Sequence, residues 1–185
     1  MTQQRLQAGH TAVLVVDIQE KLLPHMHEAE AVAEQAQKLV AGAAVLGLPV
    51  LVTEQYRQGL GPTVPPLAQA LAAARAAGPF EKLKFSAHIE PVRAALAERQ
   101  VHSVIVCGIE AHVCVMQTCL DLVEAGYLTA VALDAIGSRC PADRDAAVLR
   151  LVQAGVLPTT VEAALWEMTR EAGTELFQRM LGVIR

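Results

Sequence analysis

Cys114 is the residue of this chain whose position could support covalent chemistry. The residues before it read as a β-branched strand that ends at Gly108, and those after it read as a helix with Cys114 in its first turn. Unpaired N–H groups at a helix N-terminus stabilise a thiolate, so we expect the pKa of Cys114 to fall below the ordinary ~8.5. The alternative is a small buried hydrophobic side chain, the usual place of an unpaired intracellular cysteine. A nucleophilic role therefore depends on partners elsewhere in the chain.

Helical spacing predicts that Cys114 lies on the polar face of its helix. The polar positions are Glu110, Cys114, Gln117, Asp121 and Glu124, and the apolar positions are Val113, Met116, Leu120 and Val123. We therefore expect the thiol to face a cleft at the start of the helix.

Two other strand-like segments carry charged residues that could act with this thiol. Asp17 follows a buried apolar run, where a carboxylate either points into a cleft or caps the next turn. Lys82 and Lys84 share one face of the segment Phe80–Phe85, and alternation does not decide which of them faces a cleft; a solvated lysine is the ordinary alternative. Together with Cys114, such residues would supply a base, a cation and a nucleophile.

Strand-like and helical segments alternate along the chain, which predicts an α/β fold. We expect strands at 11–17, 49–53, 80–85, 101–107, 129–134 and 157–161, and helices at 29–46, 90–99, 111–125, 142–154 and 161–170, with one or two helices in 161–185. This pattern is typical of a three-layer α-β-α, Rossmann-like fold with a six-stranded, mostly parallel sheet and a site at the carboxyl ends of the strands. The segment 54–66, rich in glycine and proline, is expected to be irregular and to line the pocket.

Composition restricts the class of protein. A length of 185 residues favours a single domain, 1–185, and the apolar runs are far shorter than the ~20 residues of a membrane-spanning helix. The N-terminal residues show no apolar region typical of a secretory signal, so a cytoplasmic location is expected. The short apolar runs argue against a membrane partner, and a net charge of −4 with 3% aromatic residues argues against a nucleic-acid partner. No Cys-x-x-Cys pair is present, so neither a disulfide nor a zinc framework is expected.

Three segments give the sequence a resemblance to a known family. Val-Val-Asp-Ile-Gln (15–19), Lys-Leu-Lys-Phe-Ser-Ala (82–87) and Gly-Ile-Glu-Ala-His-Val-Cys-Val (108–115) resemble the isochorismatase-like hydrolases, which include nicotinamidases and N-carbamoylsarcosine amidohydrolases. The similarity continues through 53–56, 59–63 and 137–139, nearly end to end. The resemblance implies a catalytic triad of Asp17, Lys82 and Cys114. Lys82 is chosen over Lys84 because the lysine is the first residue of the family pattern in this segment. The chain departs from that pattern at His88, where an aromatic residue is common.

The resemblance also implies a mechanism and a site. Asp17 would take the thiol proton, Lys82 would stabilise the thiolate, and a thioester would form on Cys114. The backbone N–H groups of Glu110 and Cys114 would bind the oxyanion, with a cis peptide at Ile109–Glu110 aiming the former. Gln19, Tyr56, Phe85 and His112 are expected to line the substrate pocket. A Cys114–His112 dyad is disfavoured because residues two apart on a helix point in different directions.

Departures from the family's better-known members narrow the activity. Metal-dependent nicotinamidases have histidines after the second strand, and 53–61 contains none, so we expect no metal and no cofactor. Isochorismatases lack the cysteine present here. The remaining activity is hydrolysis of another small amide, ureido or related C–N bond, with a small molecule as the substrate. The resemblance also implies a homo-oligomer. The alternative is a non-catalytic or redox-active metabolite-binding protein on the same fold; a dinucleotide-binding module is disfavoured because no Gly-x-Gly-x-x-Gly follows the first strand.

Overall fold

A six-stranded parallel sheet organises the computed structural model, which describes residues 5–185; residues 1–4, part of the segment read for a secretory signal, lie outside it. The strands are β1 (Thr11–Val16), β2 (Val50–Gln55), β3 (Ala77–Lys82), β4 (Ser103–Ile109), β5 (Leu128–Gly137) and β6 (Leu157–Thr159). Their order is β3-β2-β1-β4-β5-β6, and every neighbouring pair is parallel. The predicted α/β sheet is thus confirmed.

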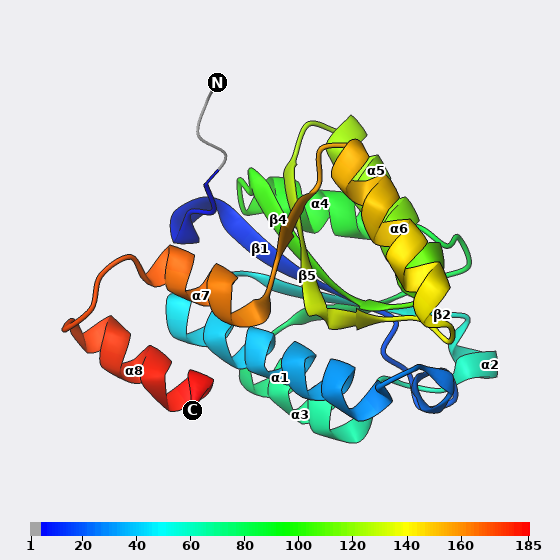
Figure 1. The fold of residues 1–185 in the computed structure, drawn as a ribbon, viewed down its shortest axis with the longest axis horizontal. Helices are drawn as coiled ribbons and strands as arrows, with labels where there is room; N and C mark the ends of the chain where they lie inside the picture. Colours follow the sequence, from blue (N-terminus) through cyan, green and yellow to red (C-terminus); the bar gives the residue numbers. More distant parts are fainter. Residues whose placement is uncertain (1–4) are drawn as a thin grey trace.

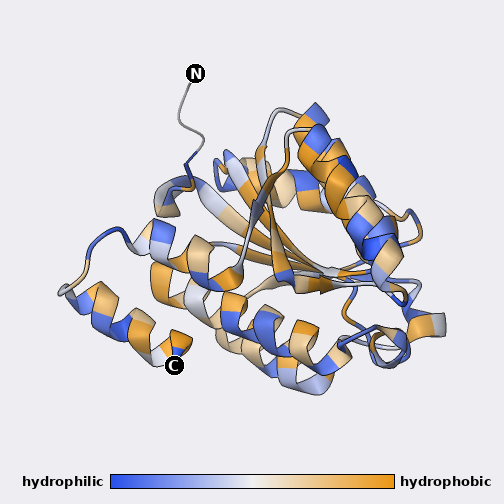
Figure 2. Ribbon diagram, viewed as in Figure 1, coloured by the Kyte–Doolittle hydropathy of each residue, from blue (hydrophilic) through white to orange (hydrophobic). Residues whose placement is uncertain are grey.

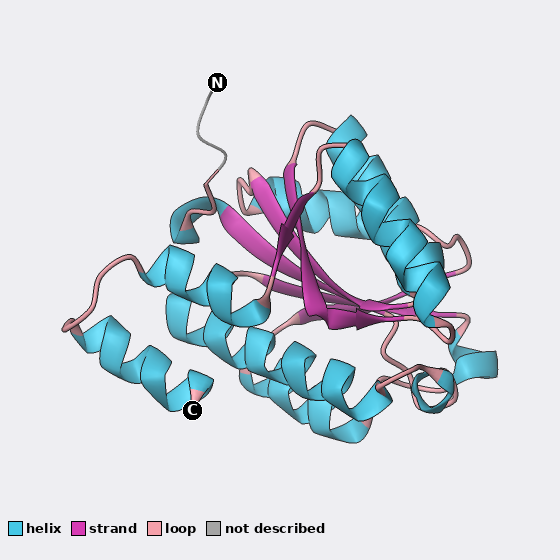
Figure 3. Ribbon diagram, viewed as in Figure 1, coloured by secondary structure: helices cyan, strands magenta, loops and turns pink. Residues whose placement is uncertain are grey.

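Helices cover both faces of this sheet (Figures 1 and 3). The helices are α1 (Ala29–Leu46), α2 (Arg57–Leu60), α3 (Pro65–Ala73), α4 (Glu90–Glu98), α5 (Met116–Glu124), α6 (Pro141–Gln153), α7 (Val161–Thr169) and α8 (Glu175–Ile184), with short turns η1 (Ala8–His10), η2 (Leu23–His25) and η3 (Ala111–Val115). Helices α1, α3, α7 and α8 lie on one side, and α4, α5 and α6 on the other. The three predicted layers are therefore present, and no helix within residues 5–185 is long and apolar enough to cross a membrane.

Strict side-chain alternation along the central strands produces two hydrophobic cores. Val13 and Val15 of β1 pack toward α1, whereas Ala12 and Leu14 pack toward α4 and α5. Figure 2 shows the strands as mostly hydrophobic, while the helices carry both kinds of residue. Such doubly buried strands explain the short continuous apolar runs in the sequence.

Gly108 allows the carboxyl ends of β1 and β4 to approach closely. A Cβ atom at this position would lie 2.0 Å from the carbonyl oxygen of Val16, and Gly108 has a φ of +129°, which side chains rarely allow. The residues that leave β1 and β4 therefore emerge side by side at one edge of the sheet.

One prediction about a strand and one about a loop are wrong. The third strand runs from Ala77 to Lys82, so residues 83–85 have left the sheet. The segment 54–66 is not irregular: its first residues extend β2, α2 follows, and an antiparallel bridge joins Gln19 to Thr63 before α3 begins at Pro65. The two prolines, Pro65 and Pro66, were read as loop residues, yet proline fits the first turn of a helix.

The helix that follows β4 also differs from the prediction, because its first turn, Ala111–Val115, is a π-helix. Its buried positions are Ala111, Cys114, Val115, Thr118, Cys119 and Leu122, whereas the predicted apolar positions are only partly buried. Cys114 thus lies on the core side of the helix rather than on a polar face. Small thiol and hydroxyl side chains can fill that side, so hydropathy alone misleads here.

Candidate active site

Asp17 is the first residue after β1 and is completely buried. Its backbone is left-handed, with a φ of 55°, and its N–H donates to the carbonyl of Thr53 at 3.2 Å. One carboxylate oxygen accepts the Thr53 hydroxyl at 2.8 Å, and the other accepts the Lys82 ammonium at 2.6 Å. The carboxylate is therefore held from β2 and β3 at the carboxyl edge of the sheet.

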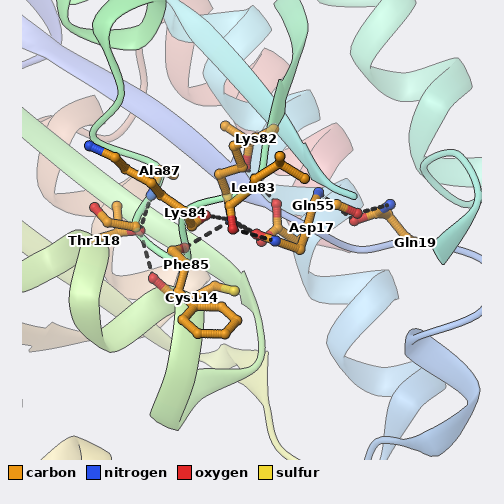
Figure 4. A network of polar contacts seen from close by, with 12 residues as sticks. Asp17, Gln19, Gln55, Lys82, Leu83, Lys84, Phe85, Ala87, Cys114 and Thr118 are labelled. Carbon is orange, nitrogen blue, oxygen red and sulfur yellow. Dashed lines mark hydrogen bonds and ion pairs between the residues drawn. The ribbon is translucent and has the colours of Figure 1, made fainter. Parts of the chain in front are cut away.

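Lys82 ends β3 and is also fully buried, whereas Lys84 is exposed. Its Nζ donates to Asp17, to Gln55 Oε1 at 2.8 Å, and to the carbonyls of Phe85 at 2.9 Å and Lys84 at 3.3 Å (Figure 4). An ammonium has three protons, so these four acceptors occupy it fully. Lys82 acts here within the protein and has no proton to spare for a ligand.

Cys114 lies in the π-helical turn next to this pair, with 4% of its surface exposed. Its carbonyl accepts the Thr118 hydroxyl at 2.6 Å, and the same hydroxyl oxygen accepts the N–H of Ala87 at 2.8 Å (Figure 4). The peptide bond between Ile109 and Glu110, just before this turn, is cis, as the family resemblance implies.

The electrostatics of the site contradict the predicted thiolate. Burial raises the pKa of Cys114 to about 12; the negative charge of Asp17 adds to this rise, and Lys82 opposes it. Burial also raises the pKa of Asp17, although Lys82 and Thr53 lower it. Desolvation therefore outweighs any effect of the helix terminus, and Cys114 is a neutral thiol at neutral pH.

The expected pocket residues have different environments. Gln19 is buried, and its amide bonds the backbone of Gln55 and the carbonyl of Gly61, so it braces β2 instead of facing a ligand. Tyr56 and Phe85 are each 53% exposed. A hollow of about 340 Å³ is lined by Tyr56, Arg57, Gln58, Glu81, Lys82 and Leu83; of the three predicted catalytic residues, only Lys82 is among them.

Two further predicted site residues, His112 and Glu110, contact the residues that follow β5. His112 Nδ1 pairs with the Ser138 hydroxyl at 2.9 Å. The Glu110 carboxylate accepts Arg139 Nε at 2.9 Å, and the Glu110 carbonyl accepts the N–H groups of Val113 and Val115 at 3.0 and 3.2 Å. These contacts fix the turn that carries Cys114 from the neighbouring strand.

Three residues of the network were missed in the sequence: Thr53, Gln55 and Thr118. Thr53 is paired with Val16 in the parallel register of β1 and β2, directly before Asp17. A polar residue at the end of a buried strand was the available signal for Thr53 and Gln55. Thr118 had no such signal, because its place on the buried face follows from the π-helical turn.

Metal ligation is not suggested by the described part of the chain. Among residues 5–185, no group of three or more His, Cys, Asp or Glu side chains could hold a metal ion. The absence of a metal or cofactor in the working protein remains a prediction.

Comparison with known proteins places this chain in a family. Residues 11–163 match the isochorismatase domain. A secreted isochorismatase effector, Isc1 of Phytophthora sojae, is 37% identical over 95% of this chain and 85% of its own length. The structure titled MAR1 ribonuclease from Caenorhabditis elegans has a TM-score of 0.90 at 36% identity, covering 97% of this chain and 92% of its own.

Two structures of YcaC are also similar. YcaC from Pseudomonas aeruginosa, solved with covalent acrylamide, has a TM-score of 0.87 at 26% identity, covering 99% of this chain and 93% of its own. YcaC from Escherichia coli, described as an octameric hydrolase of unknown specificity, has a TM-score of 0.84 at 25% identity, covering 96% and 91%. The domain match and the three-layer fold agree with the residues that first suggested the resemblance, and the chain belongs to the isochorismatase family of hydrolases.

Proposed function

We propose that this chain is a cysteine hydrolase that cleaves a small amide, ureido or related C–N bond through Asp17, Lys82 and Cys114. The observation that carries the proposal is the fully buried ion pair of Lys82 and Asp17 at 2.6 Å, whose charges both act on the thiol of Cys114. Buried ion pairs contribute little net stability, so a pair beside a potential nucleophile favours a role in chemistry.

The proposed reaction begins with transfer of the thiol proton to Asp17 as sulfur attacks the carbonyl carbon. The tetrahedral intermediate collapses, the C–N bond breaks, and Asp17 returns the proton to the leaving nitrogen. The resulting thioester on Cys114 is hydrolysed by water that Asp17 deprotonates, which releases a carboxylic acid and restores the thiol. A neutral resting thiol is compatible with these reaction steps, because the adjacent Asp17 accepts the thiol proton as the bond from sulfur to carbon forms.

Lys82 and the backbone N–H groups have supporting roles in this proposal. Lys82 keeps Asp17 ionised and positioned, since its protons are occupied by protein acceptors. The N–H groups of Glu110 and Cys114 are proposed to bind the oxyanion, and each such donor is worth about 3–4 kcal/mol in comparable enzymes. Tyr56, Phe85 and His112 are proposed as the residues that contact the substrate.

The names of relatives provide two competing substrates. Isc1 suggests the vinyl ether of isochorismate, and MAR1 suggests RNA. The chain carries a net charge of −4, which gives phosphates no broad electrostatic attraction. YcaC from Pseudomonas aeruginosa was solved with covalent acrylamide. Acrylamide reacts with nucleophiles through its activated double bond, so this adduct supports a nucleophile in that relative and does not select the substrate class.

The decisive experiment is hydrolysis of a panel of small primary amides and N-carbamoyl amino acids, with isochorismate and RNA included. We expect turnover of at least one amide or ureido compound and its loss in Cys114→Ser. Turnover of isochorismate or RNA alone, unaffected by Cys114→Ser, would contradict the proposal. The redox alternative is separated by Asp17→Asn, which should lower hydrolysis by about 10²–10⁴ without slowing peroxide oxidation of Cys114; equal loss of both would remove that distinction.

We also propose that the chain forms a homo-oligomer in the cytoplasm. The E. coli YcaC relative is octameric, and large apolar side chains such as Leu83, 77% exposed, remain uncovered in one copy. The described cysteines are all unpaired, as expected in a reducing compartment. Light scattering at micromolar concentration tests the assembly, and a monomer would contradict it.

A further inference from the structure

The π-helical turn that carries Cys114 and the loop 83–87 after Lys82 both bind the hydroxyl oxygen of Thr118. Thr118 is completely buried, and its hydroxyl donates to the carbonyl of Cys114 at 2.6 Å while accepting the N–H of Ala87 at 2.8 Å. Ala87 lies two residues after Phe85, whose carbonyl accepts Lys82 at 2.9 Å. Three hydrogen bonds and the backbone of residues 85–87 between them therefore connect Cys114 to Lys82 (Figure 4).

We infer that Thr118 is a positioning residue that sets the location of the Lys82 charge relative to the Cys114 sulfur. The inference rests on the proposed function, because it concerns the same triad. It adds a residue that touches none of the reacting atoms, and it assigns the loop 83–87 a role beyond connecting β3 to α4.

The physical basis is that two carbonyls of this loop hold the ammonium of Lys82 and depend on the anchoring of Ala87. Without the hydroxyl, the buried N–H of Ala87 loses its acceptor, and an unsatisfied buried donor drives local rearrangement. The loop carbonyls then shift, and Lys82, which otherwise keeps only Asp17 and Gln55 as acceptors, moves its charge away from the Cys114 turn. Since Lys82 opposes the rise in the pKa of Cys114, its retreat makes the thiol harder to ionise.

A second threonine provides a matched control. Thr169 is also buried, and its hydroxyl donates to the carbonyl of Leu165, four residues earlier, at 2.8 Å. This contact has the same form as that of Thr118 with Cys114, but it lies in α7, on the opposite face of the sheet from α5. Thr169→Val therefore removes the helical contact without touching the site.

The test is the rate at which iodoacetamide alkylates Cys114 at fixed pH, followed by peptide mass spectrometry in the full chain. Every protein carries Cys140→Ser, because Cys140 is exposed and would react first. We expect Thr118→Val, which keeps the shape but not the hydroxyl, to slow alkylation at least threefold. Thr118→Ser and Thr169→Val should stay within twofold of the parent. If Thr118→Val does not fold, Thr118→Ala replaces it, with the same expected slowing.

Unchanged or faster alkylation in Thr118→Val would overturn the inference, as would equal slowing in Thr169→Val. Lys82→Ala distinguishes this failure from failure of the triad itself. If Lys82→Ala slows alkylation and Thr118→Val does not, only the positioning role fails. If Lys82→Ala has no effect, the coupling of Lys82 to Cys114 fails, and the proposed function fails with it.

Discussion

Asp17 and Glu54 are two buried carboxylates that follow or end neighbouring parallel strands. Each accepts a threonine hydroxyl at 2.8 Å and each pairs with one cation. The partners of Glu54 lie close in sequence: Arg57, and Thr63, which also donates its backbone N–H at 2.7 Å. The partners of Asp17 come from distant strands, and its cation is as deeply buried as the carboxylate.

This comparison teaches that burial and pairing do not by themselves identify a catalytic acid. Glu54 holds a local segment, since its bonds close the stretch between β2 and α3 and its cation is half exposed. Asp17 joins three strand ends and has a thiol beside it. The neighbouring ionisable group separates a candidate base from a structural carboxylate.

Neutralising the two carboxylates should separate them most strongly. Asp17→Asn removes the proposed proton acceptor, so we expect kcat for the identified amide to fall by about 10²–10⁴. Glu54→Gln should keep kcat within about tenfold, because Glu54 only supports the segment before α3. Parallel steady-state assays measure this difference, and equal losses would show that the two carboxylates do not differ in role.

Removing the two cations should separate the carboxylates by stability. Lys82→Ala leaves Asp17 buried without its partner, and we expect the free energy of unfolding to fall by about 3–5 kcal/mol. Arg57→Ala should cost about 1 kcal/mol, because this cation is partly solvated and Glu54 keeps both donors of Thr63. Urea denaturation at pH 7 gives both values.

The pH dependence of the Lys82→Ala loss has a definite sign. Burial raises the pKa of Asp17, and without Lys82 that rise is larger. A carboxyl whose folded pKa is raised binds more protons in the folded state, so its contribution favours folding at low pH and is lost as pH rises through the raised pKa. The Lys82→Ala loss should therefore be smaller at pH 4 than at pH 8, and an unchanged loss would contradict the assigned pKa direction.

The thiol beside Asp17 gives a third contrast. Because the pKa of Cys114 is raised to about 12, its alkylation in a Cys140→Ser background should rise about tenfold per pH unit from pH 8 to pH 11. An ordinary thiol would level off above ~8.5. Asp17→Asn should make alkylation faster, since the Asp17 charge raises this pKa, and Glu54→Gln should not change it. A plateau near pH 8.5 would restore the thiolate expected from the sequence.

The two threonines form the finest comparison. Thr53→Val and Thr63→Val each remove one hydroxyl bond to a buried carboxylate, and each should lower the free energy of unfolding by about 1–2 kcal/mol. Only Thr53→Val should change the pH profile of hydrolysis, shifting the limb assigned to Asp17 to higher pH, because Thr53 lowers the Asp17 pKa. A shift of similar size in Thr63→Val would show that the effect is not local to Asp17.

Sequence reasoning predicted the strands and their parallel arrangement because the apolar runs are short and alternate with helical segments. It also selected residues that the structure brings together, Asp17, Lys82 and Cys114, although the choice of Lys82 over Lys84 came from the family pattern. Side-chain alternation could not choose between the two lysines, because positions 82 and 84 would share one face of a continuous strand. In the structure the strand ends at Lys82, so Lys84 is not part of it.

Other features depend on geometry that no local pattern encodes. The π-helical turn changes which residues of the helix face the core, so Cys114 and Thr118 are buried where a polar face was expected. The predicted direction of the Cys114 pKa shift was wrong because of this burial. Desolvation raises the pKa of a buried thiol by more than a helix terminus lowers it. Gln19 was assigned to the pocket, but its partners on β2 and near α2 hold it inside.

The position of β1 between β2 and β4 has a consequence for the order in which the protein assembles. Thr11 of β1 bonds Ser103 of β4, 92 residues later, and Lys82 reaches Asp17 across 65 residues. Contacts over such separations form late in folding, because closing long loops costs entropy before any contact rewards it. Protection of Cys114 during refolding should therefore report when β3, β1 and β4 have come together, so one thiol follows the assembly of the central part of the sheet.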